Sequence, residues 1–150
     1  MSKIPAGQRI TPYLSVRNAA KAIEFYRRAF GAVETMRLED PSGRVSHAEL
    51  ELDGAKWMLA DEHPEMAFVG PEALGGTTVT LSIYVEDVDA LAARAIAAGA
   101  KSLKPITDEF YGERVAQLAD PFGHRWSFQS RLEEISTEEM QRRYAKLIGG

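Results

Sequence analysis

Two parts of this chain repeat one another at a constant separation of 69 residues. The segment GAKWML occupies residues 54–59 and GHRWSF occupies residues 123–128, with a glycine, a basic residue and a tryptophan in both. Thr11 and Thr80, far upstream of these segments, are also separated by 69 residues. Because one separation holds in two distant parts of the sequence, we predict two copies of one structural unit.

The beginning of each copy predicts a short strand followed by a helix. Residues 11–32 and 80–100 both start with alternating side chains, pass through a polar break and then place apolar residues at helical spacing. Both stretches end in Gly-Ala. Residues that commonly begin and end helices stand at the expected places, with Asn18 and Asp87 at the N-termini and Gly31 and Gly99 at the C-termini.

The rest of each copy predicts three further strands, of which the last two form a hairpin. In the first copy, residues 44–52 alternate, an Asp-Gly turn follows, and residues 55–61 alternate again. In the second copy, the hairpin strands are residues 114–120 and 124–130. The strands directly after the helices have the weakest patterns and lie around residues 33–39 and 101–106. Each copy is therefore expected to be a βαβββ module.

We expect an α+β fold in which two tandem βαβββ modules form a curled mixed sheet around a cavity, followed by a C-terminal helix. The expected single domain covers residues 8–130, and the helical tail covers residues 131–150. Within the domain, module 1 covers about residues 8–61, a linker rich in Pro and Gly covers residues 62–78, and module 2 covers about residues 79–130. The tail begins with a predicted capping box, Ser136 and Glu139, and its apolar stripe indicates packing on the core or on a second subunit.

Composition excludes several classes of partner. The net charge is −4 and the pI is about 5.4, whereas nucleic acids and anionic membranes are bound by basic surfaces. The chain has no cysteine, which excludes disulfides and thiolate chemistry. No apolar stretch reaches the ~20 residues of a membrane helix, and residues 1–10 lack the apolar core of a signal peptide. A cytoplasmic location without membrane contact is therefore expected.

Alternation along the predicted strands divides their side chains between two faces. An apolar set should pack under the helices, namely Leu14, Val16, Trp57, Leu59, Leu81, Ile83, Val85, Trp126 and Phe128. The other face combines hydroxyl, aromatic and charged side chains, among them Thr11, Tyr13, Ser15, His47, Glu49, Met58, Thr80, Ser82, Tyr84 and Ser127. This second face is either open to water or curled around a ligand cavity, and the sequence leaves both alternatives open.

Several motifs resemble the vicinal-oxygen-chelate superfamily, the group of glyoxalases, bleomycin-resistance proteins and extradiol dioxygenases. They are the paired βαβββ pattern, FYRRAFGA in the first helix, VEDVDA before the second helix, and DPFGHRWSF near the end. The resemblance covers roughly residues 8–130. Within the group, HAEL, MLADE, YGERV and STEEMQRR look most like the bacterial proteins grouped with the phosphonate-operon member. The resemblance implies the fold but no particular reaction, because this fold carries several chemistries.

The resemblance also implies where a metal ion would lie. In the superfamily's metal enzymes, His, Glu or Gln side chains from the first and last strand of each module hold a divalent ion. The corresponding positions here are Thr11, Met58, Thr80 and Ser127. Hydroxyl and thioether groups are unsuited to Zn, Mn, Fe or Ni, so we expect no metal and no cofactor at these positions. An atypical metal site that includes His47 and Glu49 is the alternative.

Other residues are candidates for binding or chemistry. His47 and Glu49 are the candidate catalytic residues, because an imidazole or a carboxylate can act as a general base. Arg114 stands at a loop-to-strand junction, where its guanidinium could hold a carboxylate or phosphate or could form a surface ion pair. The candidate ligand-binding residues are Thr11, Tyr13, Met58, Thr80, Ser82, Tyr84, Tyr111, Arg114 and Ser127.

Two functions of different classes are consistent with these residues. The first is a metal-free binding protein of the glyoxalase/bleomycin-resistance type, which would sequester a small drug-like or metabolite-like molecule. The second is a lyase, isomerase or dioxygenase-like enzyme with an atypical metal site or a His/Glu general base, in which Arg114 holds an anionic substrate. A regulatory or accessory domain is a further alternative. The resemblance implies a homodimer with cavities at or near the interface.

Overall fold

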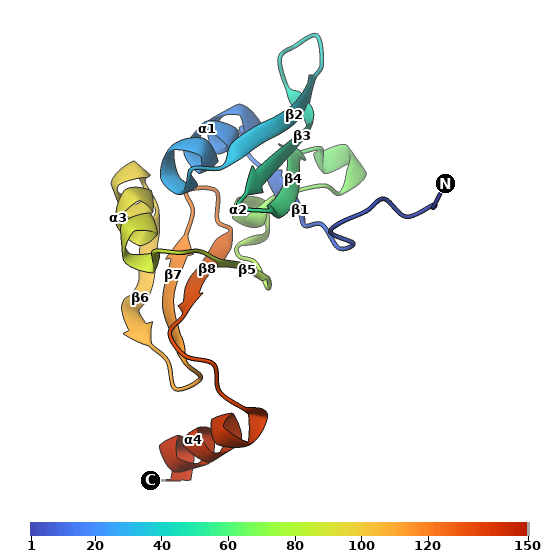
Figure 1. Cartoon of the computed structure of the whole chain (residues 1–150). Helices are drawn as coiled ribbons and strands as arrows, with labels where there is room; N and C mark the ends of the chain where they lie inside the picture. The colour runs from blue at the N-terminus through green and yellow to red at the C-terminus, as the bar shows by residue number, and fades with distance from the viewer. Residues whose placement is uncertain (150) are drawn as a thin grey trace.

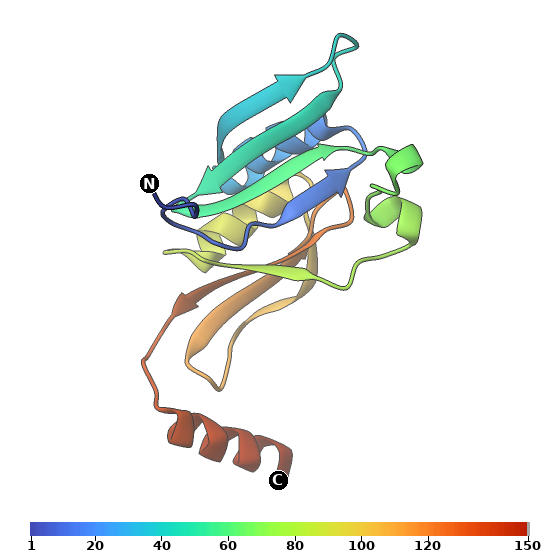
Figure 2. The same ribbon diagram turned by 90° about the vertical axis from the view of Figure 1, so that its right-hand side faces the viewer.

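The computed structural model describes residues 1–149 and contains two four-stranded sheets, each covered on one face by a helix (Figures 1 and 2). The first module consists of β1 (Tyr13–Val16), α1 (Ala19–Phe30), β2 (Val33–Glu39), β3 (Val45–Leu52) and β4 (Ala55–Asp61). The second consists of β5 (Thr80–Tyr84), α3 (Val88–Ala98), β6 (Lys101–Asp108), β7 (Glu113–Ala119) and β8 (Arg125–Arg131). The connecting segment contains η1 (Pro64–Met66) and α2 (Pro71–Leu74), and α4 (Thr137–Gly149) follows β8. The expected α+β fold with tandem βαβββ modules and a C-terminal helix is confirmed.

The two sheets have the same topology. Their strand orders are β1-β4-β3-β2 and β5-β8-β7-β6, in which the first pair is parallel and the other pairs are antiparallel. Tyr13 pairs with Met58 in the first sheet, and Ser82 pairs with Ser127 in the second. Both members of the second pair lie 69 residues after their counterparts, so the repeat in the sequence is a repeat in three dimensions.

The predicted residues begin and end α1 and α3, the helices of the two modules. The side-chain oxygen of Asn18 accepts a hydrogen bond from the Lys21 N–H at 3.2 Å, and that of Asp87 accepts one from the Ala90 N–H at 3.0 Å. Gly31 follows α1 with φ of 78°, a left-handed conformation in which a side chain would be strained. The helices therefore start and stop where local sequence chemistry directs them.

Helix α4 lies apart from both sheets, at the bottom of Figures 1 and 2. The Ser136 hydroxyl oxygen accepts a hydrogen bond from the Glu139 N–H at 3.1 Å, which is one half of the predicted capping box. The Arg143 side chain donates to the Phe110 carbonyl at 3.0 Å and attaches the helix to the β6–β7 connection. Leu147 and Ile148 are 65% and 66% exposed, so the apolar stripe is not covered by the core of its own chain. No helix within residues 1–149 is long and apolar enough to cross a bilayer.

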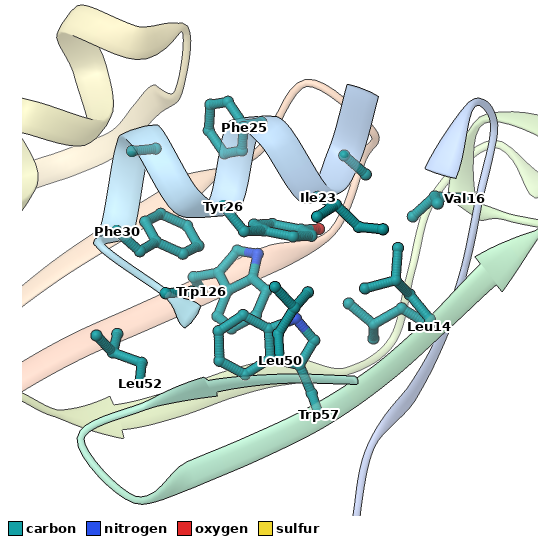
Figure 3. Packing of buried hydrophobic residues seen from close by; sticks show 14 of the residues in the cluster. Leu14, Val16, Ile23, Phe25, Tyr26, Phe30, Leu50, Leu52, Trp57 and Trp126 are labelled. Atoms are coloured by element: carbon teal, nitrogen blue, oxygen red, sulfur yellow. The ribbon is translucent and has the colours of Figure 1, made fainter. Parts of the chain in front are cut away.

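One hydrophobic core joins the two modules. Tyr26 projects from α1 onto Trp57 of the first sheet and Trp126 of the second, and Phe30 packs against Trp126 (Figure 3). The two indole rings lie 5.1 Å apart between centroids, and all four side chains are buried. Offset and edge-on contacts of this kind stabilise aromatic pairs beyond their burial.

A buried carboxylate is part of this core. Asp120 is 6% exposed and lies in the turn before β8. One of its oxygens accepts hydrogen bonds from the Tyr26 hydroxyl at 2.5 Å and the Trp126 indole N–H at 2.9 Å. The other accepts from the backbone N–H groups of Phe122 and His124. Burial and the adjacent Asp120 raise the pKa of the Tyr26 phenol well above its usual range.

We predict that Tyr26→Phe lowers the free energy of unfolding by about 1–3 kcal/mol, because a buried acceptor loses one hydrogen-bond donor. Tyr144→Phe on α4 is the matched control, since this phenol is half exposed and its loss should change stability by less than about 0.5 kcal/mol. Urea unfolding followed by tryptophan fluorescence measures both. Equal effects of the two substitutions would contradict this assignment.

We also predict that stability falls at alkaline pH through Tyr26. In the unfolded chain this phenol titrates near its ordinary pKa of about 10, whereas in the folded chain its pKa is raised. Stability from this group is therefore complete below about pH 10 and falls by up to about 1.4 kcal/mol per pH unit above it. Urea unfolding across this range should show a steeper decline for the wild type than for Tyr26→Phe. Parallel declines would refute the prediction.

Candidate functional site

Each sheet has one face covered by a helix and one open face. The predicted division of side chains is confirmed for the covered faces, where seven of the expected residues are buried and two are half-buried: Leu14, Val16, Trp57, Leu59, Ile83, Trp126 and Phe128, then Leu81 and Val85. The candidate site residues lie mainly on the opposite faces. The strand registers place them in two separate groups, one on each sheet.

The open face of the first sheet brings together a tyrosine, a histidine and a glutamate from distant parts of the chain. The Tyr13 hydroxyl lies 2.7 Å from Nδ1 of His47, and Nε2 of the same ring lies 2.8 Å from Oε2 of Glu49. Tyr13 belongs to β1, whereas His47 and Glu49 belong to β3, so the hydrogen-bonded chain crosses β4. Desolvation, with a contribution from the Glu49 charge, raises the pKa of the Tyr13 phenol.

Apolar side chains lie on both sides of this Tyr–His–Glu chain. On β2, Met36 is directly opposite Glu49 and Leu38 is directly opposite His47, and both are exposed. On β4, Met58 lies between Tyr13 and Glu49 in the register of the sheet. The face is therefore a polar strip bordered by thioether, aliphatic and aromatic groups.

The segment between the modules forms a wall beside Tyr13. The Phe68 ring meets the Tyr13 ring edge-on, with centroids 5.6 Å apart and an interplanar angle of 88°. An open cavity of about 690 Å³ lies here, lined by Tyr13, Ser15, His124 and residues of the segment 67–78. The sequence predicts a linker loop here, without the position of its side chains. Its glycines and prolines indicate turns, and nothing in their pattern shows that Phe68 contacts β1.

The backbone of β1 fixes two residues at this cavity, His124 in its lining and Gly70 in the segment that forms its wall. Nε2 of His124 lies 3.0 Å from the Ser15 carbonyl oxygen. Gly70 packs so closely against the same carbonyl that an added Cβ would lie 2.7 Å from the oxygen. The Ser15 hydroxyl is buried in this structure with no hydrogen-bond partner. These contacts hold the wall of the cavity against the first sheet.

The open face of the second sheet carries two sets of hydrogen-bonded side chains. The Ser127 hydroxyl donates to Oε1 of Gln129 at 3.1 Å, and Nε2 of Gln129 donates to the Ser82 hydroxyl oxygen at 2.5 Å. Tyr84 donates to the Glu113 carboxylate, and this hydrogen bond raises the pKa of the phenol. Ser82, Tyr84 and Ser127 are among the predicted ligand-binding residues. Gln129 is not, although its strand position places it on the same face.

Arg114 lies on the helix-covered side of the second sheet. Its guanidinium donates two hydrogen bonds to Asp89 of α3 at 2.8 Å each and one to Asp108 at 2.7 Å, and these partners raise its pKa. Tyr111 is half-buried in the β6–β7 connection beside Phe110, and burial raises the pKa of its phenol. Neither residue lies in the hydrogen-bonded groups on the two open faces.

The four positions at which the resemblance implies metal ligands do not fit a divalent ion. Thr11 lies before β1. The next residue, Pro12, accepts a hydrogen bond at its carbonyl oxygen from the Met58 N–H at 2.8 Å. Thr80 begins β5, and Ser127 lies in β8. None of the four provides an imidazole or a carboxylate, the groups that bind such ions well. In residues 1–149, no cluster of three or more His, Cys, Asp or Glu side chains could hold a metal ion.

Comparison with known proteins gives a consistent group of relatives. Residues 9–128 match the family model of the Glyoxalase/Bleomycin resistance protein/Dioxygenase superfamily. An uncharacterized protein of Mycobacterium tuberculosis is 42% identical over 135 residues, which cover 88% of this chain and 79% of that protein. The crystal structure of TioX from Micromonospora sp. ML1 has a TM-score of 0.65 at 27% identity and covers 86% of this chain and 100% of its own. A PhnB protein from Bacillus cereus shares the fold, with a TM-score of 0.61 at 21% identity over 82% of this chain and 99% of its own.

We predict that Gly70→Ala destabilises the cavity wall. The φ of Gly70 is −92°, which alanine adopts freely, so the effect should come from the close Ser15 carbonyl alone. The expected loss is about 1–3 kcal/mol in the free energy of unfolding. Gly149→Ala is the control, because an added Cβ there has no atom within 4 Å. Urea unfolding of both variants tests this, and an unchanged stability of Gly70→Ala would show that the wall yields without cost.

Proposed function

Because this chain belongs to the Glyoxalase/Bleomycin resistance protein/Dioxygenase superfamily, we propose that it binds a small drug-like or metabolite-like molecule against the open face of its first sheet. The observation that carries the proposal is the Tyr13–His47–Glu49 chain, which stands among apolar side chains and beside a cavity of about 690 Å³. Ligand sites commonly combine apolar walls with a few polar groups in volumes of roughly 300–1,000 Å³.

The exposed apolar residues support this assignment. Leu38 is 55% exposed and Tyr13 is 44% exposed. Both side chains lie on the open face of the first sheet, which also carries Met36 and Met58. Contiguous exposed apolar surface is unfavourable in water unless another molecule covers it. Thioether and aromatic groups adapt well to flat organic molecules. A flat, partly apolar ligand fits this surface.

We propose that binding does not use the superfamily's metal. The support is the chemistry of Thr11, Met58, Thr80 and Ser127, which offer hydroxyl and thioether groups in place of His, Glu or Gln. The ligand would instead be oriented by hydrogen bonds to the polar strip.

We further propose that two copies pair as a homodimer in the cytoplasm. Each chain leaves one face of each sheet open (Figure 2) and leaves the apolar stripe of α4 exposed. A second copy could cover these surfaces. A crevice between the first sheet of one copy and the second sheet of the other would combine Tyr13 and His47 with Ser82 and Gln129. The chain has no cysteine, so its fold needs no oxidising compartment to form disulfides.

The same hydrogen-bonded chain favours a second candidate function, proton transfer in an enzyme of the lyase, isomerase or dioxygenase-like type. Both ring nitrogens of His47 are engaged, so Tyr13 would be the group that exchanges a proton with the substrate. His47 and Glu49 would position and polarise the phenol. In this candidate the substrate is not held by Arg114, because Asp89 and Asp108 occupy its guanidinium.

Native mass spectrometry of untagged protein tests the proposed function. The protein is purified without chelator, offered Zn, Mn, Fe and Ni in turn, and then screened against a library of aromatic metabolites and antibiotics. We expect a dimer that retains no metal and binds organic compounds, with affinity reduced about tenfold or more by Tyr13→Ala, which removes a large contact. Lys21→Ala, an exposed change on α1, which covers the opposite face of the first sheet, is the control and should leave affinity unchanged.

Three outcomes would redirect the assignment. One metal ion held tightly per subunit contradicts the metal-free proposal. A bound compound whose affinity is unaffected by Tyr13→Ala contradicts the location of the site. Conversion of a bound compound to a new mass favours the second candidate function over simple binding.

A further inference from the structure

The neighbours of Tyr13 determine which hydrogen-bonding role its hydroxyl can offer to a ligand. A phenol both donates and accepts, whereas a neutral imidazole has one N–H donor and one acceptor nitrogen. The direction of each hydrogen bond in the Tyr13–His47–Glu49 chain therefore follows from the group at its end. That group is the Glu49 carboxylate, whose side chain is 40% exposed.

The carboxylate fixes the tautomer of His47. An ionised carboxylate accepts hydrogen bonds and cannot donate, so Nε2 of His47, 2.8 Å from Glu49, must carry the ring proton. In the neutral ring, Nδ1 then has a lone pair and no proton. Because Nδ1 lies 2.7 Å from the Tyr13 oxygen, the phenol must donate its proton to this nitrogen.

The Tyr13 oxygen is consequently left as an acceptor. Its only proton is used within the protein, and the lone pairs on the oxygen remain for a ligand. A ligand carbonyl, ether or carboxylate can only accept hydrogen bonds, so it would form none with the lone pairs of the Tyr13 oxygen. A ligand hydroxyl or N–H would be satisfied, and the nearby negative charge of Glu49 also favours a donor over an anion.

A second side chain that lines the cavity, His124, also offers a hydrogen-bond acceptor. Nε2 of His124 lies 3.0 Å from the Ser15 carbonyl oxygen, which can only accept, so Nε2 carries the proton of this ring as well. In the neutral ring, Nδ1 of His124 is then an acceptor. Tyr13 and His124 both line the cavity of about 690 Å³, together with the Phe68 ring.

We propose that the ligand of the first sheet is a flat aromatic compound that presents a hydrogen-bond donor, a phenolic hydroxyl or a ring N–H, to the Tyr13 oxygen. This inference rests on the proposed function, because it requires a ligand on this face. The His47–Glu49 pair is a positioning pair, which sets the polarity of Tyr13 without contacting the ligand. The edge-on contact between Phe68 and Tyr13 and the adjacent Met58 favour a flat ring beside the donor.

Two matched probes test the polarity, 2-naphthol, which has a hydroxyl donor, and 2-methoxynaphthalene, which has the same rings without it. We expect the wild type to bind 2-naphthol about 2- to 10-fold more tightly, the ratio that one neutral hydrogen bond provides. Tyr13→Phe should abolish the preference, whereas Tyr144→Phe on α4 should keep it. Protein NMR shifts, assigned through the variants, show where each probe binds.

Nitrogen-15 NMR of the imidazole rings reads the tautomer without any ligand, with His47→Gln used to assign the signals. In the neutral ring of His47 we expect the proton at Nε2, and we expect loss of this fixed tautomer in Glu49→Leu. A ring protonated at Nδ1 overturns the inference, because the Tyr13 hydroxyl would then be free to donate.

The binding results separate the inference from the proposed function. Equal affinities for the two probes, with shifts at Tyr13 and His47, overturn the donor preference while the binding site stands. The absence of shifts at these residues for both probes overturns the inference together with the assignment of this face as a site for flat aromatic ligands.

Discussion

The buried carboxylate of Asp120 fixes how the two modules meet. It accepts hydrogen bonds from Tyr26 of the first module and from Trp126 and two backbone N–H groups of its own module. A buried charge is strongly unfavourable without such partners, so α1 and the turn before β8 must stay together. This requirement places Trp57 against Trp126 and makes the helix-covered faces a common core. The open faces are then the surfaces left for binding.

The two open faces have the same backbone plan and different chemistry. Tyr13, Met58 and Glu49 of the first sheet correspond in register to Ser82, Ser127 and Gln117 of the second. At these positions the first face therefore contains a phenol, a thioether and a carboxylate, whereas the second contains two hydroxyl groups and an amide. Repetition of the fold constrains the buried side chains, because they must fill the same space. The open positions are free of that constraint and differ between the modules.

The segment between the modules packs against the first module as well as connecting the two. Pro71 of this segment is buried, and Gly70 contacts the backbone of β1 closely. Glu62 accepts hydrogen bonds from the Gly70 N–H and from Arg17, which holds the segment beside the first module. The hydrogen bonds from Gly70 and Arg17 lower the pKa of the Glu62 carboxyl. A short helix and a close glycine contact thereby convert a linker into one wall of the candidate site.

The sequence by itself determined the repeat, the order of the strands and helices, the helix ends and the side chains that face the core. These features depend on local periodicity and capping, which neighbouring residues control. Only the tertiary structure decided that Tyr13 meets His47, 34 residues away, across β4, and that Phe68 covers one side of the Tyr13 ring. It also decided that Arg114 faces Asp89 of α3 and that α4 leaves its apolar stripe uncovered. Such contacts join segments that are distant in the chain, and their geometry follows from strand register and loop packing, which no local pattern specifies.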